Sequence, residues 1–211
     1  SSLLKKADLA LYSVKESGRN DFRIYDAAMS KLVQNQNSLR SELRAAIEQE
    51  QFELYYQPIL DLKAKEVRCA EALIRWHHPR HGLILPDKFI PLAEETGLIA
   101  QLGEWILQQG CKDAAAWPGN CRIAINLSAH QFKPGNLFDL VLCALVESGL
   151  RPDRLELEIT ETALLHDQFE HLLALRQINN IGVTIALDDF GTGYSSANYL
   201  TLFPFDKIKI D

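Results

Sequence analysis

Two adjacent carboxylates follow a run of residues that is typical of a buried strand. Asp188 and Asp189 come directly after residues 184–187, and a glycine-containing turn at 190–193 follows them. Side chains alternate between the two faces of a strand, so these carboxylates start on opposite faces. Adjacent carboxylates in a desolvated place repel each other and need a cation, a proton or a helix N-terminus nearby. An Asx turn followed by a helix N-cap explains this segment equally well.

Further polar residues occupy the face opposite the aliphatic one in other strand-like segments. With Asp188 and Asp189 they make four carboxylates, one amide and one ammonium, the added residues being Glu71, Asn126, Glu158 and Lys209. Carboxylates that converge cannot all be ionised without cations. Oxygen ligands without His or Cys suit Mg²⁺, Mn²⁺ or Ca²⁺. The set predicts two metal ions, with Asp188 as a candidate bridge, and metal pairs of this kind hydrolyse phosphate esters.

Lys209 has two interpretations in such a site. A lysine beside metal ions loses its proton more easily, so it could orient or deprotonate an attacking water. It could instead form a salt bridge to a carboxylate of the same site.

Strands and helices alternate from residue 51 onward. We predict strands at 52–58, 67–75, 121–128, 154–159, 183–188 and 206–211, and helices near 87–95, 99–116, 136–148 and 167–179. This alternation indicates parallel pairing and an α/β fold. Each strand has one aliphatic face and one polar or small face, unlike the strands of a sheet covered on both sides. We therefore predict a barrel whose lumen leads to the site; an antiparallel sheet with one solvated face is the alternative.

The N-terminal residues form a different pattern. Apolar spacing predicts a helix at 4–17 and a short strand at 22–25, at the end of a unit too small to fold alone. The chain begins within a helical pattern, which suggests a fragment of a longer protein. Residues 28–50 predict a linker helix with one apolar stripe that docks on the following domain.

Composition and charge narrow the class of protein. The chain is 47% hydrophobic with a net charge of −6, so it lacks the basic footprint of a general nucleic-acid binder. Its four cysteines form no C-x-x-C pair, and reduced thiols are expected. We see no membrane segment and no signal peptide in this chain. We expect a cytoplasmic protein, or the cytoplasmic part of a membrane-anchored one.

Five ordered motifs resemble one bacterial family, the EAL domain. They are E-A-L-I-R-W (71–76), N-L-S (126–128), E-I-T-E (158–161), D-D-F-G-T-G-Y-S-S (188–196) and K-I-D (209–211). The resemblance covers 51–211 and implies hydrolysis of cyclic di-GMP to linear pGpG. It implies a TIM-like (β/α)8 barrel whose first strand is antiparallel. The family continues past K-I-D with two more βα units, so we expect the barrel to be truncated after its sixth strand.

The resemblance also implies a role for each matching residue. Residues 71, 126, 158 and 188 resemble ligands of a first metal, and 188 and 189 those of a second, with Mg²⁺ or Mn²⁺ as the cofactor. The implied catalytic residues are Lys209, which positions the attacking water, Glu71 and Asp188. The implied substrate contacts are Gln57, Leu73 and Arg75. The implied coupling of the metal site to a dimer interface uses Glu161, Phe190, Gly191, Thr192 and Gly193.

The resemblance implies partners and domains as well. Residues 7–25 resemble the end of a GGDEF (diguanylate cyclase) domain without its signature loop. We therefore predict a GGDEF remnant at 1–27, a linker helix at 28–50 and an EAL domain at 51–211. Expected partners are cyclic di-GMP, upstream GGDEF and sensory domains in the same protein, and a second copy in a homodimer. Two alternatives stay open: a receptor that binds cyclic di-GMP without hydrolysing it, and a dimerising fragment without a ligand.

Three smaller expectations concern residues outside these motifs. His77 and His78 are expected as solvated residues of a loop. Glu156 is expected deeper in the lumen than Glu158, paired with Lys207 or Arg122. The three tryptophans are expected in packing roles.

Overall fold

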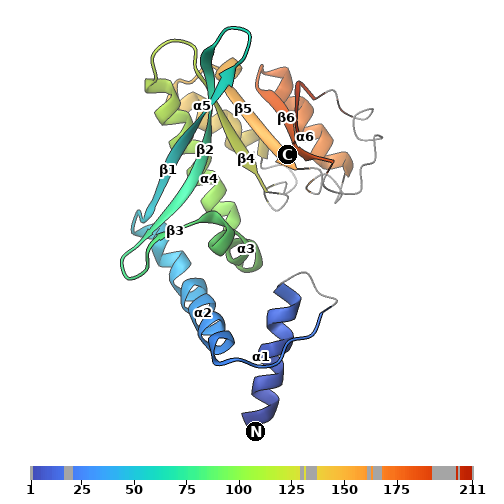
Figure 1. Cartoon of the computed structure of the whole chain (residues 1–211). Coiled ribbons are helices and arrows are strands. Elements are labelled where there is room, and N and C mark those ends of the chain that lie inside the picture. Colours follow the sequence, from blue (N-terminus) through green and yellow to red (C-terminus); the bar gives the residue numbers. More distant parts are fainter. Residues whose placement is uncertain are drawn as a thin grey trace.

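One mixed sheet carries the site, with helices packed on its outer side (Figure 1). The structure is a computed structural model that describes residues 2–16, 21–128, 131, 137–160, 163, 168–191, 203 and 205–210. Within these ranges the strands are β1 (Phe52–Asp61), β2 (Glu66–His78), β3 (Gly82–Ile84), β4 (Arg122–Leu127), β5 (Leu155–Thr160), β6 (Thr184–Phe190) and β7 (Lys207–Ile210). The helices are α1 (Ser2–Glu16), α2 (Ala27–Glu48), α3 (Pro86–Thr96), α4 (Ile99–Ala116), α5 (Leu137–Ser148) and α6 (Gln168–Asn180), with a 3-10 turn at Pro152–Arg154.

The order of the strands is β1-β2-β4-β5-β6-β7, with β3 paired to β2. The strands β2, β4, β5, β6 and β7 run parallel, whereas β1 and β3 are antiparallel to β2. This arrangement confirms the α/β fold with an antiparallel first strand. Among the described residues β1 and β7 are the two ends of the path, so the barrel is an open one here, in agreement with a truncated (β/α)8 barrel.

The alternation of side chains explains why the sheet has a helix-facing side and a lumen side. Leu155, Leu157 and Ile159 of β5 are fully buried in the core shared with the helices. Helix α4 approaches β4 closely at Gly110, where an added Cβ would lie 2.9 Å from Ile125 Cδ1. The polar residues between these aliphatic positions face the lumen, as a period of two requires.

The predicted linker helix is present as α2. Asp26 caps its N-terminus by accepting a hydrogen bond from the backbone N–H of Ala28. Leu43 and Ala46 are fully buried in the core, and Leu39 and Ile47 pack against it. The apolar stripe therefore docks on the following domain, as expected. None of the described helices is long and apolar enough to cross a membrane.

Three local predictions were wrong. Residues 22–25 form no strand, and the side chains of Phe22 and Ile24 are both 83% exposed. Strand β2 does not end at residue 75 but continues to His78, and the short strand β3 was missed. Both errors have the same cause, because β3 pairs with residues 76–78 and so extends β2 as a hairpin. The domain division at residues 27 and 50 stays a prediction.

Candidate functional site

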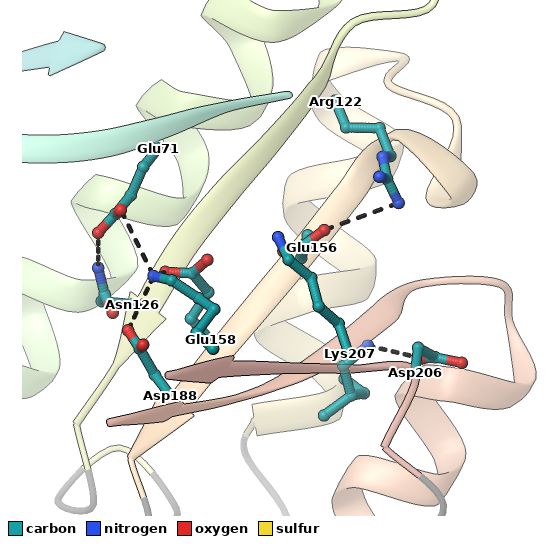
Figure 2. Close-up of polar contacts among 10 residues, drawn as sticks. Glu71, Arg122, Asn126, Glu156, Glu158, Asp188, Asp206 and Lys207 are labelled. Atoms are coloured by element: carbon teal, nitrogen blue, oxygen red, sulfur yellow. Dashed lines mark hydrogen bonds and ion pairs between the residues drawn. The ribbon is translucent and has the colours of Figure 1, made fainter. Parts of the chain in front are cut away.

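Three carboxylates from three strands converge on one ammonium group (Figure 2). The Nζ atom of Lys209 on β7 lies 2.5 Å from Glu158 Oε2 on β5 and 2.9 Å from Asp188 Oδ2 on β6. It lies 3.4 Å from Glu71 Oε2 on β2. Parallel strands bring these residues to one lumen face, although they are far apart in the sequence.

Asn126 joins this cluster through Glu71. Its Nδ2 group donates a hydrogen bond of 2.8 Å to Glu71 Oε1. In the register of the sheet Asn126 lies directly beside Glu158. The predicted residues Glu71, Asn126, Glu158, Asp188 and Lys209 therefore form a single cluster in the structure.

Asp189 lies at an irregular end of β6. Its φ angle is 54°, in the left-handed region, and the register between β6 and β7 shifts between Leu187 and Phe190. Its backbone N–H donates a hydrogen bond of 3.0 Å to Asp188 Oδ1. Non-glycine residues in this region are strained, and such strain is common at functional sites. The adjacent carboxylates thus lie within the irregular last residues of β6, which ends at Phe190.

Glu158 is the most deeply buried carboxylate of the cluster. Its residue is 1% exposed, and its Oε1 atom is buried without a hydrogen-bond partner. Burial raises the pKa of Glu158 to about 7, the hydrogen bond from Lys209 opposes this, and the charges of Glu71 and Asp188 add to it. This carboxylate is short of positive partners in the structure.

Lys209 keeps its proton in this arrangement. Burial favours the neutral amine, but the hydrogen bonds to Glu158 and Asp188 outweigh burial and raise the pKa of Lys209. The ammonium group therefore acts as a counter-ion here. The salt bridge of the second interpretation is present in the structure, and the role of Lys209 toward an attacking water stays a prediction.

The donor set of the cluster suits a hard divalent cation. Its acidic side chains offer only carboxylate oxygen atoms, which hard divalent cations prefer. Among the described residues, one of these atoms, Glu158 Oε1, accepts no hydrogen bond. Across the described ranges, no three His, Cys, Asp or Glu side chains are already arranged around a common metal position. The carboxylates of Glu71, Glu158 and Asp188 face the ammonium of Lys209 instead. A metal ion would therefore compete with this ammonium group for the same oxygen atoms.

The three predicted substrate contacts lie beside the cluster on the β1–β2 hairpin. Gln57 pairs with Glu71 in the register of the two strands and is exposed. Leu73 and Arg75 follow Glu71 at alternate positions of β2, so they share its face. The guanidinium of Arg75 lies 5.5 Å from the centre of the Tyr55 ring and donates a hydrogen bond to its neighbour's carbonyl oxygen. The hairpin thus places Arg75 on the same face of β2 as Glu71, four residues further along the strand.

The predicted coupling loop is described only in part. Phe190 ends β6 and packs against the core, and Gly191 follows with a φ of 99°, a conformation that favours glycine. Glu161, Thr192 and Gly193 lie outside the described residues. Their roles stay predictions.

His78 has a partner that the sequence did not suggest. It is the last residue of β2, is 3% exposed, and its Nε2 atom lies 2.6 Å from Glu42 Oε2 on α2. The expectation of a loop was wrong for both histidines, because both lie in β2. His77 is exposed as expected, with its Nε2 atom 2.7 Å from Glu53 Oε2, whereas His78 is buried. Alternation continued past residue 75 would have found it, because Ile74, Trp76 and His78 share the buried face.

Two further expectations are confirmed. Trp76 is fully buried, and Trp105 and Trp117 pack against the core. Glu156 is fully buried beneath Glu158 and contacts both expected cations, with Lys207 Nζ at 2.6 Å and Arg122 Nη1 at 3.7 Å.

The fold and the site define an α/β barrel domain with an acidic lumen at the ends of its parallel strands. The model of the EAL domain family matches residues 40–211, and the chain therefore belongs to the EAL domain family.

Two relatives of known name support this assignment. The chain is 43% identical to the bifunctional diguanylate cyclase/cyclic di-GMP phosphodiesterase MucR of Pseudomonas aeruginosa, a match that covers 99% of this chain and 31% of that protein. It is 38% identical to the cyclic di-GMP phosphodiesterase PdeR of Escherichia coli, with 100% and 32% covered. The chain thus spans about a third of the length of these two relatives.

A solved structure with high similarity is that of the PaMucR phosphodiesterase in complex with c-di-GMP. It superposes with a TM-score of 0.78 at 45% identity, covering 82% of this chain and 72% of that chain. The EAL enzyme Bd1971, in a form bound to cAMP and cyclic di-GMP, gives a TM-score of 0.78 at 32% identity, covering 85% of this chain and 50% of that chain.

Proposed function

We propose that this chain is part of a phosphodiesterase domain that hydrolyses cyclic di-GMP to linear pGpG in bacterial second-messenger signalling. The observation that supports this most is the convergence of Glu71, Glu158 and Asp188 on Lys209 at one place in the lumen. The names of MucR and PdeR agree with this activity.

The proposal includes two divalent ions, Mg²⁺ or Mn²⁺. Glu71, Asn126, Glu158 and Asp188 would hold the first, and Asp188 and Asp189 the second. When bound, such ions lower the pKa of a coordinated water and stabilise charge that develops on the phosphate. The unpaired Oε1 atom of Glu158 supports a cation at this place, because a buried acceptor without a donor is costly.

The residues of the chain then have separate tasks in the reaction. Water adds across one phosphodiester bond, so that a P–O bond to the water oxygen forms and the bond to the ribose 3′ oxygen breaks, and this oxygen takes a proton. Lys209 carries its proton at Nζ and donates hydrogen bonds, so its task is to orient the attacking water. Arg75 can bind a phosphate oxygen with a planar guanidinium, and Gln57 and Leu73 contact the rest of the ligand.

The wider context belongs to the proposal as well. The protein would carry an upstream GGDEF domain and a sensory domain, act as a homodimer in the cytoplasm, and couple its dimer interface to the site through Glu161 and residues 190–193. The signal would reach the EAL domain along the linker helix 28–50.

Turnover of cyclic di-GMP by the full-length protein tests the activity. With Mg²⁺ or Mn²⁺ we expect pGpG, separated by liquid chromatography, and Glu71→Gln should slow its formation by roughly 10²-fold or more. Glu66→Gln is the matched control, since Glu66 begins the same strand, is exposed, and lies outside the cluster. Binding of cyclic di-GMP without pGpG in either metal would replace the enzyme with the receptor alternative.

A further inference from the structure

A second pair of charges lies beneath the acidic cluster and repeats its geometry. Lys207 and Lys209 share the lumen face of β7, because Ile208 between them points outward. Lys207 Nζ lies 2.6 Å from Glu156 Oε1, just as Lys209 Nζ lies 2.5 Å from Glu158 Oε2. Both contacts join β7 to β5, and β6 lies between these two strands in the sheet.

The lower pair is held firmly because Glu156 has few other partners. Glu156 is fully buried, and its Oε2 atom makes no hydrogen bond, although Arg122 Nη1 lies 3.7 Å away. A buried charge that loses its partner is strongly destabilising. If Lys207 left, Glu156 would keep only the longer contact with Arg122 among the described cations, so the protein would lose stability.

Outside this pair, the register of β7 has few determinants. Just before the strand, the carboxylate of Asp206 accepts hydrogen bonds from Ile185 N–H at 2.8 Å and from Asn179 Nδ2 at 2.9 Å, but within the strand itself the constraints are weak. It has four residues, and its ladder with β6 shifts register between Leu187 and Phe190. Burial of an aliphatic face normally fixes register, but Ile208 is 42% exposed and Ile210 82% exposed. In the part of the chain that the structure describes, β7 has no strand on its other edge.

A slip of β7 would remove Lys209 from the cluster. A shift by one residue would turn both lysines away from the lumen. A shift by two residues would bring Lys207 to the position beside Glu158 that Lys209 now occupies. Only the present register satisfies both buried glutamates at once. We propose that the Glu156–Lys207 pair fixes the register of β7 and thereby positions Lys209 for the reaction. As far as catalysis is concerned, this inference rests on the proposed function.

Variants of Lys207 in the full-length protein test the proposal by two independent readouts. Lys207→Met should speed hydrogen exchange of the backbone amides of 207–210 by about 10-fold or more, because the ion pair that fixes the register of β7 is lost and the strand opens more often. It should lower kcat for cyclic di-GMP by about 10-fold or more with KM within about 2-fold, because Lys209 is misplaced. Lys207→Arg keeps the ion pair and should preserve both values.

A matched control and a second variant make the test decisive. Lys88→Met removes an exposed lysine paired with Asp87 at 3.0 Å, and neither readout should change. If Lys207→Met does not fold, the double variant Glu156→Gln, Lys207→Met removes both charges, leaves no unpaired buried charge, and should show the same losses.

The proposal is overturned if the variant that folds keeps wild-type exchange in β7 and a kcat within about 2-fold of wild type. If the wild-type protein does not hydrolyse cyclic di-GMP, the proposed function fails, and hydrogen exchange alone decides whether the pair fixes the register.

Discussion

Two glutamates of this protein have pKa values displaced in opposite directions. Glu158 in the lumen faces one ammonium and two carboxylates, and burial raises its pKa to about 7. Glu42 on α2 accepts hydrogen bonds from Ser38 and Arg80 and lies 2.6 Å from His78 Nε2. These donors, Ser38 first and Arg80 second, lower the pKa of Glu42 to about 2. The same functional group thus has an excess of acceptors around it at one place and an excess of donors at the other.

The difference in pKa distinguishes Glu42, which forms a structural contact, from Glu158, which can still accept hydrogen bonds or a cation. At the junction of α2 with β2, Ser38, His78 and Arg80 all contact the carboxylate of Glu42, and this contact helps to hold the linker helix on the domain. In the lumen the carboxylates outnumber the cations, so the cluster loses stability in return for affinity toward a cation. This contrast leads to four predictions, given from the largest expected effect to the smallest.

The largest effect is expected for Glu158→Gln. Hydrolysis of cyclic di-GMP should fall by roughly 10²-fold or more, since the proposed function makes Glu158 a metal ligand and this ligand is lost. The raised pKa means that ionised Glu158 destabilises the fold, so wild-type stability falls as pH rises from the unfolded pKa toward about 7. With a chelator present at pH 8, the variant should therefore unfold at a higher temperature than wild type.

Calorimetry in EDTA and a turnover assay in Mg²⁺ measure these two effects. A variant that is both inactive and less stable than wild type at pH 8 would contradict the assignment of Glu158 as a carboxylate short of donors.

The opposite sign is expected for Glu42→Gln. At pH 7 this change should lower the free energy of unfolding by about 1–2 kcal/mol, because hydrogen bonds to a charged acceptor are lost. Since the pKa of Glu42 is lowered, the wild-type advantage is complete above the unfolded pKa and disappears as pH falls from about 4.5 toward about 2. Urea unfolding measures it, with Glu95→Gln, which removes the exposed partner of Arg40, as the control. An equal loss in both variants would reduce Glu42 to an ordinary surface charge.

A smaller effect is expected at the two neighbouring histidines. His78→Gln should speed hydrogen exchange in the C-terminal half of α2, because the buried ring that contacts Glu42 is replaced. His77→Gln should leave α2 unchanged, since His77 is exposed and lies beside Glu53 on β1. Mass spectrometry of exchanged peptides compares the two. Equal exchange would show that α2 is held by its apolar stripe alone.

The smallest effect concerns the cysteine thiols, whose rates of alkylation measure how deeply each side chain is buried without any substitution in the protein. Burial, with the charge of Glu156 next, raises the pKa of Cys69 to about 12, and burial does the same for Cys111. Only the thiolate is alkylated, so at pH 8 iodoacetamide should modify exposed Cys143 well before either of them. Peptide mapping of the folded protein checks this order. Early modification of Cys69 would mean that the layer around Glu156 is open to solvent.

Side-chain alternation predicted the acidic site well, because a period of two fixes which residues share a face. It placed Glu71, Asn126, Glu158, Asp188 and Lys209 in one lumen, and they meet there. It did not show which partner Lys209 takes, since that depends on distances across three strands. The error at 22–25 has another cause: local propensity alone suggested a strand there, and none of the strands that the structure describes pairs with these residues.

Strand β2 connects the two regions compared above, since it bears Glu71 at its centre and His78 at its end. Seven residues of extended chain separate them, or about 23 Å. Along β2 the backbone between them is one hydrogen-bonded strand, paired with β1 over most of its length and with β4 around Glu71. One continuous strand therefore joins the contact of α2 at His78 to the acidic lumen at Glu71, and Gln57 of β1 is paired with that same end of the path.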